Sequence, residues 1–529
     1  MFQPETAAPS TRATGTAIRP LLPVLFLLLL GAAALPLLAS HLPPLGAYPG
    51  MLARLYALAF LDQDPILSRL YDIRWEVAPD QLMDLIMAPL VRVFDLFAAG
   101  RLFLVAALLL PVTGAAALNW ALYRRLTLAP LATFLFAYNQ AFMAGLFDFT
   151  FGLGLALWGL ALWVFCRHQS PLARGVVSMA VLAPLALSDP FALAAYAIAL
   201  LSLEARHLAA LPPRAVHRAG PEVMALLVPF VLATPLMLAG GDGELELAAP
   251  RTGTFGLAAL DWLVGSTWAP LDVLVATVVL GGVSWAVSRD TLRLHPAADW
   301  VLVAGVLAMT AQVVIEPLAV ATDGRAPVAL VFVLIGFSRW RFHSAGGRRL
   351  FVALLLALTL VRITHVGATF LRMGGVLEDL RASFRLIEPG SAILVADSDR
   401  AHWHPDYRAL SQALDQAVAL AVVDRASLVP HTVTRNGRDT LVTEPQWRDL
   451  DGPPPVRPAV RDLRAVLGGQ GPVPSERVYW KRWTDRFDYV YVLFTEAGYD
   501  PNPWPTRLTL MHQGKHFQLY KITRQSPPR

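Results

Sequence analysis

The sequence predicts a mostly helical, polytopic membrane protein with a small α/β domain after its last membrane span. Three observations predict this class: 55% of the 529 residues are hydrophobic, only 16% are charged, and the mean hydropathy is +0.50. Soluble proteins hold about 45–50% apolar and about 25% charged residues. A soluble chain of this composition would lack the polar side chains to cover its surface. The composition therefore excludes a disordered chain and argues strongly against a soluble enzyme.

The membrane spans are predicted from runs of about 20 largely apolar residues, the length that crosses a bilayer. About eleven segments meet this requirement. They are residues 20–40, 101–122, 126–145, 149–166, 172–188, 190–204, 222–240, 271–288, 299–319, 326–339 and 349–371. The first run, Leu21 to Ala39, is too long for the apolar core of a signal peptide, so we interpret it as a retained helix.

The orientation is predicted from arginines, which concentrate in alternate connections between the spans. Short basic loops lie on the cytoplasmic side. The basic set comprises Arg12, Arg19, Arg124, Arg125, Arg167, Arg174, Arg206, Arg214, Arg218, Arg289, Arg293, Arg339, Arg341, Arg348 and Arg349. The pattern predicts that the tail 1–19 is cytoplasmic and, for an odd number of spans, that the C-terminal region lies on the outer face.

Three regions follow from this reading: the tail, a membrane domain over 20–375, and an outer α/β domain over 376–529. The membrane domain includes a long outer loop, 41–100, whose stretches 51–60 and 82–97 have apolar residues at helical spacing and predict interfacial helices. We expect Asp80 to be the N-cap of the second one. In the outer domain, residues 392–396, 489–494 and 516–522 predict strands and 407–420 a helix.

Candidate site residues are ionisable or polar groups near the outer ends of the spans, where burial is costly without a partner or a function. In the first loop, Asp62 and Asp64 could act as general bases toward a hydroxyl, although a loop or cap role competes. The candidate binding residues are Arg54, Tyr138, Asn139, Asp148, Asp189, Arg325 and Arg362.

Structural roles compete for these binding residues too. Asn139 and Asp148 are typical of helix caps or turns, and Asp189 before Pro190 is a helix-start signal. For Arg362, structural pairing and phosphate binding are both open, because a buried guanidinium needs an anion.

Several other classes of function lack support in the sequence. No cluster of Lys and Arg with interleaved aromatic residues suggests nucleic-acid binding, and the single Cys166 excludes an internal disulfide. The segment His402-Trp403-His404-Pro405-Asp406 has a His-x-His pair but no evident third ligand, so we predict no metal site there. No cofactor is predicted; a divalent metal ion that assists the reaction is left open.

The layout and several segments resemble the GT-C superfamily of membrane glycosyltransferases, which use polyprenyl-phosphate sugars. In uncharacterised bacterial members the first loop is similar to Pro-Leu-x-Asp-Tyr-Pro-x-His-Leu-Ala-Arg, and this chain has LPPLGAYPGMLARLYAL. Further similar segments are LYDIRWEVAPDQLMDLIMAPL, FAYNQAFMAGLFDFTFGLGLAL, TDGRAPVALVF, IEPGSAILVAD, FDYVYVLF and FQLYKI. These are loose patterns that cover most of the chain.

The resemblance implies a bacterial inner-membrane enzyme that transfers a sugar from a polyprenyl-phosphate-linked donor to an acceptor on the outer, periplasmic face. Membrane lipids and this donor are its implied partners. One departure matters: the family's first-loop catalytic acid falls at Gly46 or Ala47 here, and the neighbouring His is replaced by Met51. Neither replacement can accept a proton, so Asp62 or Asp64 would have to substitute.

Two other functions are left open by the sequence. The first is a catalytically inactive binding or assembly subunit on the same membrane scaffold, which the loss of the acid favours. The second is a transporter of a lipid-linked saccharide; it needs neither a large outer domain nor a long interfacial loop, and no pair of Gly/Pro-broken spans stands out.

Overall fold

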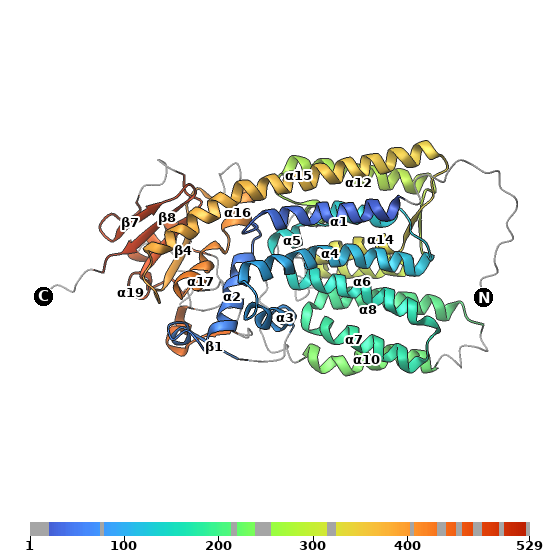
Figure 1. Ribbon diagram of the computed structural model, residues 1–529, viewed down its shortest axis with the longest axis horizontal. Helices are drawn as coiled ribbons and strands as arrows, with labels where there is room; N and C mark the ends of the chain where they lie inside the picture. The colour runs from blue at the N-terminus through green and yellow to red at the C-terminus, as the bar shows by residue number, and fades with distance from the viewer. Residues whose placement is uncertain are drawn as a thin grey trace.

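The computed structural model describes residues 21–74, 79–212, 220–238, 255–314, 324–401, 407–430, 441–450, 457–468, 479–496 and 502–524. The tail 1–19 and the His402–Asp406 segment lie outside these residues. A bundle of long helices occupies one end of the molecule and an α/β domain the other (Figure 1). The predicted mostly helical, polytopic class with a small C-terminal sheet is confirmed.

The bundle contains the predicted membrane helices. Within the described residues, seven helices are long and apolar enough to cross a membrane. They are α1 (Leu22–Ala39), α4 (Leu96–Tyr123), α6 (Phe147–Phe165), α7 (Pro171–Ser188), α8 (Pro190–Ala209), α12 (Ala269–Ser288) and α15 (Ala345–Ser383). Three further predicted spans correspond to α10 (Gly220–Leu238), α13 (Ala298–Val314) and α14 (Arg325–Gly336). The number of spans stays a prediction.

The predicted span 126–145 is not one helix. It consists of a 3-10 helix, η2 (Ala129–Phe136), and a five-residue helix, α5 (Gln140–Ala144). Asn139 separates the two in an extended conformation, and Gly145 ends α5 at a φ of +93°, which glycine adopts without a steric cost. This irregular backbone is surrounded by protein, since most of its side chains are buried, as such backbone must be at membrane depth.

The long first loop has regular secondary structure and contacts both the bundle and the C-terminal domain. It contains α2 (Tyr48–Phe60), the 3-10 helix η1 (Leu67–Arg69), β1 (Tyr71–Ile73) and α3 (Leu82–Val91). Strand β1 pairs antiparallel with β5 (Leu441–Thr443) of the C-terminal domain, which we call the outer domain after its predicted side of the membrane. The predicted helix over 82–97 ends at Val91, because α4 starts separately at Leu96 with Asp95 as its N-cap. Asp80 is not an N-cap; Gln81 precedes α3.

The outer domain is built on a four-stranded sheet in the order β4-β6-β8-β7. Its strands are β4 (Ile393–Asp397), β6 (Tyr489–Leu493), β7 (Leu508–Gln513) and β8 (Phe517–Ile522). Strands β4 and β6 are parallel, and their connection carries the helices α16 (Tyr407–Leu414), α17 (Ala421–Arg425), α18 (Val460–Gly468) and α19 (Trp483–Arg486). Parallel neighbours require such a long connection. The predicted strands and the start of the predicted helix at Tyr407 match these elements.

Helix α15 joins the two parts and runs from the far end of the bundle into the outer domain (Figure 1). It is continuous over 39 residues, so the predicted domain boundary at 375/376 lies within a helix. Strands β2 (Leu292–Leu294) and β3 (Ser338–Trp340), separated in sequence by α13 and α14, pair antiparallel in a short two-stranded sheet.

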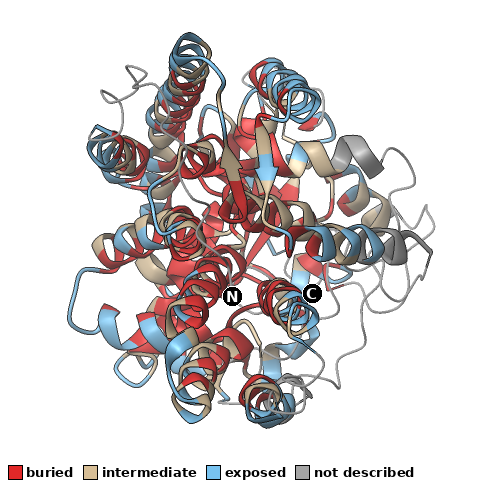
Figure 2. Ribbon diagram, turned by 90° about the vertical axis from the view of Figure 1, so that its right-hand side faces the viewer, coloured by how far each residue is buried: buried red, intermediate tan, exposed pale blue. Residues whose placement is uncertain are grey.

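Burial follows the pattern expected of a protein in lipid. Viewed along the bundle, buried segments gather at the centre and exposed ones at the periphery (Figure 2). Many exposed residues on the membrane helices are large and apolar, for example Leu27, Leu102, Val273 and Leu354. Large apolar surfaces of this kind are stable only where lipid or another protein covers them.

Helices α4 and α6 pack closely through glycines, which predicts the effect of adding one methyl group. A Cβ on Gly154 would lie 2.6 Å from the Leu110 Cβ, whereas one on Gly281 of α12 would meet nothing within 4 Å. We expect Gly154→Ala to destabilise the purified protein by about 1–3 kcal/mol through overpacking. Gly281→Ala is the matched control and should unfold at or slightly above the wild-type temperature, because alanine favours the helix over glycine. Thermal unfolding in detergent measures both; equal midpoints would contradict the packing.

Candidate functional site

Arg54 and Asp84 form a buried ion pair between α2 and α3, the two helices of the first loop. The Arg54 guanidinium on α2 lies 3.1 Å from the Asp84 carboxylate on α3, and both side chains are almost fully buried. Breaking a buried pair by removing one partner leaves an uncompensated charge. This candidate binding residue therefore holds α3 against α2.

Asp148 and Asp189 connect α3 to the ends of three further helices. The Met83 backbone N–H donates to the Asp148 carboxylate over 3.3 Å, and the Ser188 hydroxyl donates to the Asp148 carbonyl over 2.7 Å. Asp189 caps α8 by accepting from the backbone N–H groups of Phe191 and Ala192.

Asp189 also forms an ion pair with Arg325 at the start of α14. The Arg325 guanidinium lies over the Phe191 ring, 4.3 Å from its centre, a favourable placement for a cation. We define the outer corner cluster as Arg54, Asp84, Asp148, Asp189 and Arg325. It contains four of the predicted binding residues.

Arg362 lies in a second group, away from the helix ends that carry the outer corner cluster. Its side chain on α15 is 1% exposed; one terminal nitrogen lies 3.4 Å from Asp272 and the other donates to the Tyr138 carbonyl over 2.7 Å. The Tyr138 hydroxyl donates to the Ala33 carbonyl of α1. Arg362 and Tyr138 thus join α15, α12, α1 and the segment 126–145, which we call the broken span.

Asp272 is shared between the bundle and the outer domain. Arg408 of α16 lies 3.4 Å from Asp272 and binds Asp261 of α11 (Phe255–Val264) through two hydrogen bonds of 2.6 and 2.7 Å. The Ser266 backbone N–H and hydroxyl both donate to Asp272. We define Asp261, Asp272, Arg362 and Arg408 as the junction cluster.

Asp261, Asp272 and Arg408 were not among the site residues predicted from the sequence. An available signal was the charge of Asp272 in the first turn of the apolar span 271–288, since an acid at that depth needs a cation.

Asn139 acts as a helix cap in this structure. Its side-chain oxygen accepts from the Phe142 backbone N–H, and its amide donates to the Phe136 carbonyl. The residue fixes the turn between η2 and α5, next to Tyr138.

The two candidate bases lie apart from both clusters, at the end of α2. Asp62 has a side chain that is 65% exposed and pairs with Arg92 at 3.3 Å. One oxygen of Asp64 accepts from the backbone N–H groups of Ile66 and Leu67. Burial, followed by the negative charges of Asp64 and Asp424, raises the pKa of Tyr56. Asp64 therefore lies close enough to Asp424 of α17 for both to act on one tyrosine.

Gly46 and Ala47 occupy a turn that is hydrogen-bonded to the broken span. The Gly46 and Ala47 N–H groups donate to the Met143 and Ala144 carbonyls over 3.0 and 3.2 Å. A Cβ on Gly46 would lie 2.7 Å from the Ala144 carbonyl oxygen. No side chain fits at position 46 without moving the backbone, whereas Ala47 is partly exposed.

The described part of the chain holds no group of three or more His, Cys, Asp or Glu side chains that could bind a metal ion. The ionisable side chains at the outer end of the bundle instead pair with arginines or cap helices.

Comparison with known proteins adds one solved structure. No protein-family model matches the sequence, and no curated protein matches it. The crystal structure of ArnT from Cupriavidus metallidurans bound to undecaprenyl phosphate is similar to this chain at 13% sequence identity, over 96% of this chain and 99% of that one, with a TM-score of 0.40. A likeness at this TM-score gives no information about function.

The junction cluster predicts a strong dependence of stability on Asp272. We expect Asp272→Ala to destabilise the protein by about 3–5 kcal/mol, because Arg362 would then be buried without its carboxylate. Thermal unfolding and protease sensitivity of the outer domain measure the effect. Asp485→Ala, which removes an exposed acid that lies 4.0 Å from Arg482, is the control. A variant as stable as this control would show that Asp272 does not hold the junction.

The turn at Gly46 predicts that substitutions at positions 46 and 47 have different effects on thermal stability. Gly46→Ala should lower the midpoint of thermal unfolding, at a cost of about 1–3 kcal/mol, because its methyl group collides with the Ala144 carbonyl. Ala47→Ser should not lower the midpoint, because Ala47 is the N-cap of α2, where serine is favoured over alanine. If both variants unfold at the wild-type temperature, position 46 has room for a side chain.

Proposed function

We propose that this protein is a membrane glycosyltransferase-like enzyme that moves a sugar from a polyprenyl-phosphate-linked donor to an acceptor on the outer, periplasmic face of a bacterial inner membrane. The observation that carries the proposal is the position of the first loop between the bundle and the outer domain. Arg54 and Asp84 fasten its interfacial helices to each other, Asp148 fastens α3 to the bundle, and β1 pairs with β5 of the outer domain.

A loop in this position lies where a donor from the bilayer and an acceptor from water meet. In such a transfer, an acceptor hydroxyl attacks the anomeric carbon of the donor sugar while a base takes its proton. The bond between the anomeric carbon and the phosphate oxygen breaks, and the polyprenyl phosphate leaves with the electron pair. Catalysis needs a base near the hydroxyl and a cation near the leaving phosphate.

Asp64 is the better of the two candidate bases. Its second carboxylate oxygen accepts no hydrogen bond from the residues that the structure describes, while the first is held by the Ile66 and Leu67 N–H groups. That arrangement fixes the carboxylate and leaves one oxygen for a proton. Asp62 is more exposed and its charge is offset by Arg92.

Among the predicted arginines, Arg325 is the best placed to contact a phosphate. The side chains of Arg54 and Arg362 are 7% and 1% exposed, whereas that of Arg325 is 19% exposed. Arg54 and Arg362 are assigned to structural pairing, and Arg325, which pairs with Asp189, is the most exposed of the three.

The assignment of the base is tested by single substitutions in proteoliposomes supplied with a polyprenyl-phosphate sugar. Asp64→Asn keeps a side-chain oxygen that can accept from the Ile66 and Leu67 N–H groups but removes the charge. The fold should therefore persist while transfer falls by about 100-fold or more, the usual contribution of a general base. Asp62→Asn should have a smaller effect. Asp72→Asn alters a half-exposed acid of the same loop and should retain wild-type transfer.

Retained activity in Asp64→Asn would remove this residue from the reaction. Full activity in both Asp62→Asn and Asp64→Asn would exclude first-loop acids 62 and 64 as the base altogether.

A binding or assembly subunit is the second candidate, and the Gly46 turn favours it. Position 46 cannot carry an acid in this backbone, and the first-loop acids Asp84 and Asp62 are paired with arginines. This function predicts no turnover with any donor in wild-type protein, together with co-purification of an enzyme or a glycan. Movement of the donor across the vesicle bilayer without product would instead identify a transporter.

A further inference from the structure

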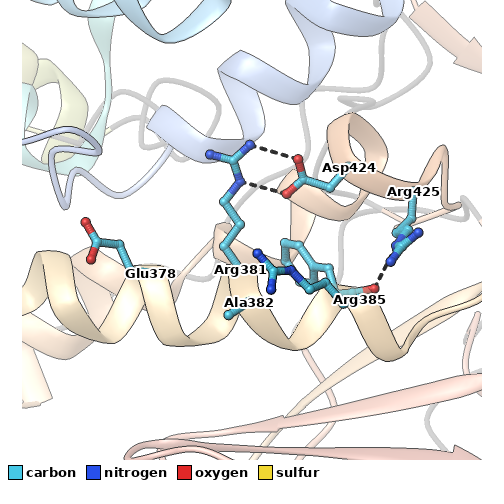
Figure 3. Close-up of a pocket in the computed structure, with 7 residues that line it drawn as sticks. Glu378, Arg381, Ala382, Arg385, Asp424 and Arg425 are labelled. Carbon is cyan, nitrogen blue, oxygen red and sulfur yellow. Dashed lines mark hydrogen bonds and ion pairs between the residues drawn. The ribbon is translucent and has the colours of Figure 1, made fainter.

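A pocket of about 500 Å³ lies where α15 meets α17, outside both clusters described above. Its size is within the range of small-ligand sites, about 300–1,000 Å³. Five charged residues and two apolar ones line it: Glu378, Arg381, Arg385, Asp424, Arg425, Ala382 and Phe384 (Figure 3).

One cation of the pocket is already neutralised. Arg381 and Asp424 form two hydrogen bonds of 2.7 and 2.8 Å in a bidentate ion pair. The Arg381 guanidinium also lies 4.4 Å from the centre of the Phe97 ring. This pair forms a rigid wall of the pocket and adds little net charge.

Two guanidinium groups have donors left for a ligand. Arg425 uses its Nε to donate to the Phe384 carbonyl over 2.9 Å, and its terminal nitrogens have no partner among the described residues. Arg385 is exposed and makes no ion pair with any described residue. Arg385 follows Arg381 by four positions, and Figure 3 shows Arg385 and Arg425 on the side of Arg381 away from Glu378. One end of the pocket is therefore positively charged.

The depth of the pocket is set by its contact with α4. Phe97 is the second residue of α4, and Leu102, five residues further, is 65% exposed on the apolar part of that helix. A helix rises about 1.5 Å per residue, so Phe97 lies about 7–8 Å beyond Leu102. The headgroup layer outside the hydrocarbon core is about 5–8 Å thick on each side. Along α15 itself, Arg381 follows the exposed Leu371 by ten residues, about 15 Å, so the pocket lies between the headgroup layer and the water beyond it.

We propose that this pocket binds a phosphate group through Arg385 and Arg425. Guanidinium groups match phosphate oxygens in geometry and stay charged at any physiological pH. The phosphate could belong to a lipid headgroup at this depth or to a water-soluble phosphate ester that enters from the outer face. Binding at this site does not require that the protein transfer a sugar.

Two probes distinguish the sources of the phosphate, both applied to the full-length protein. The soluble probe is sn-glycerol 3-phosphate, titrated by calorimetry into protein in detergent. The lipid probe is phosphatidylglycerol in nanodiscs of phosphatidylcholine, with retained lipid counted by native mass spectrometry. We expect at least one probe to bind, and Arg385→Gln to weaken it by about tenfold or more, the effect of losing a charged hydrogen bond.

Matched variants separate local binding from general charge. Arg385→Lys keeps the charge and should retain part of the affinity, and Arg482→Gln removes another exposed arginine of the outer domain and should leave affinity unchanged. Binding of the soluble probe alone identifies a phosphate ester as the ligand, and binding of the lipid alone identifies a headgroup. The proposal is overturned if neither probe binds, or if Arg385→Gln binds as the wild type does. Because neither probe donates a sugar, this result is independent of the transferase assay.

Discussion

The outer half of this protein depends on pairing charges that its helices bury. A charge buried at the end of a membrane helix is tolerated only when an opposite charge or several hydrogen bonds compensate its desolvation. Arg54 meets Asp84, Arg325 meets Asp189, and Asp272 meets both Arg362 and Arg408. Each pair joins separate elements, so the same interactions that make the charges acceptable also fix the arrangement of the helices. In the junction cluster, one carboxylate serves the bundle through Arg362 and the outer domain through Arg408.

The first loop contacts both the helical bundle and the outer domain. Its Gly46–Ala47 turn is hydrogen-bonded to the end of the broken span, α3 is attached to α6 through Asp148, and β1 pairs with β5. Tyr71 adds a hydrogen bond from its hydroxyl to the Ser427 carbonyl. A loop attached at so many points cannot move as a free lid. Access to any site beneath it must therefore come from the side, between the helices, or from the outer domain.

Hydropathy predicted the mostly helical class and the places of the long spans because apolar length is a local property of the sequence. The broken span was predicted as one helix: its composition is apolar throughout, and the break is made by the Asn139 cap, the Gly145 conformation and contacts with Gly46. The sequence also indicated which charged residues lie near the ends of the spans, but it did not indicate which residues they pair with. Asp272 and Arg362 are 90 residues apart in sequence, and Asp189 and Arg325 are 136 apart. Only the folded helices decide which of several acids each arginine meets, which is why Arg362 was left open between pairing and phosphate binding.

These pairings narrow where chemistry can occur. A general base needs a carboxylate oxygen that is not committed to an arginine, and a phosphate site needs a guanidinium with donors to spare. Within the described chain, Asp64 meets the first requirement, and Arg385 and Arg425 meet the second, while Asp84, Arg54 and Arg362 meet neither. The negative charges of Asp64 and Asp424 both raise the pKa of Tyr56. Asp424 also lines the pocket that contains Arg385 and Arg425. Asp64 follows the end of α2, and α17, which carries Asp424, packs against α2. If the missing acid at Gly46 has been replaced at all, this edge between α2, α15 and α17 is where its replacement and an anionic ligand would approach each other.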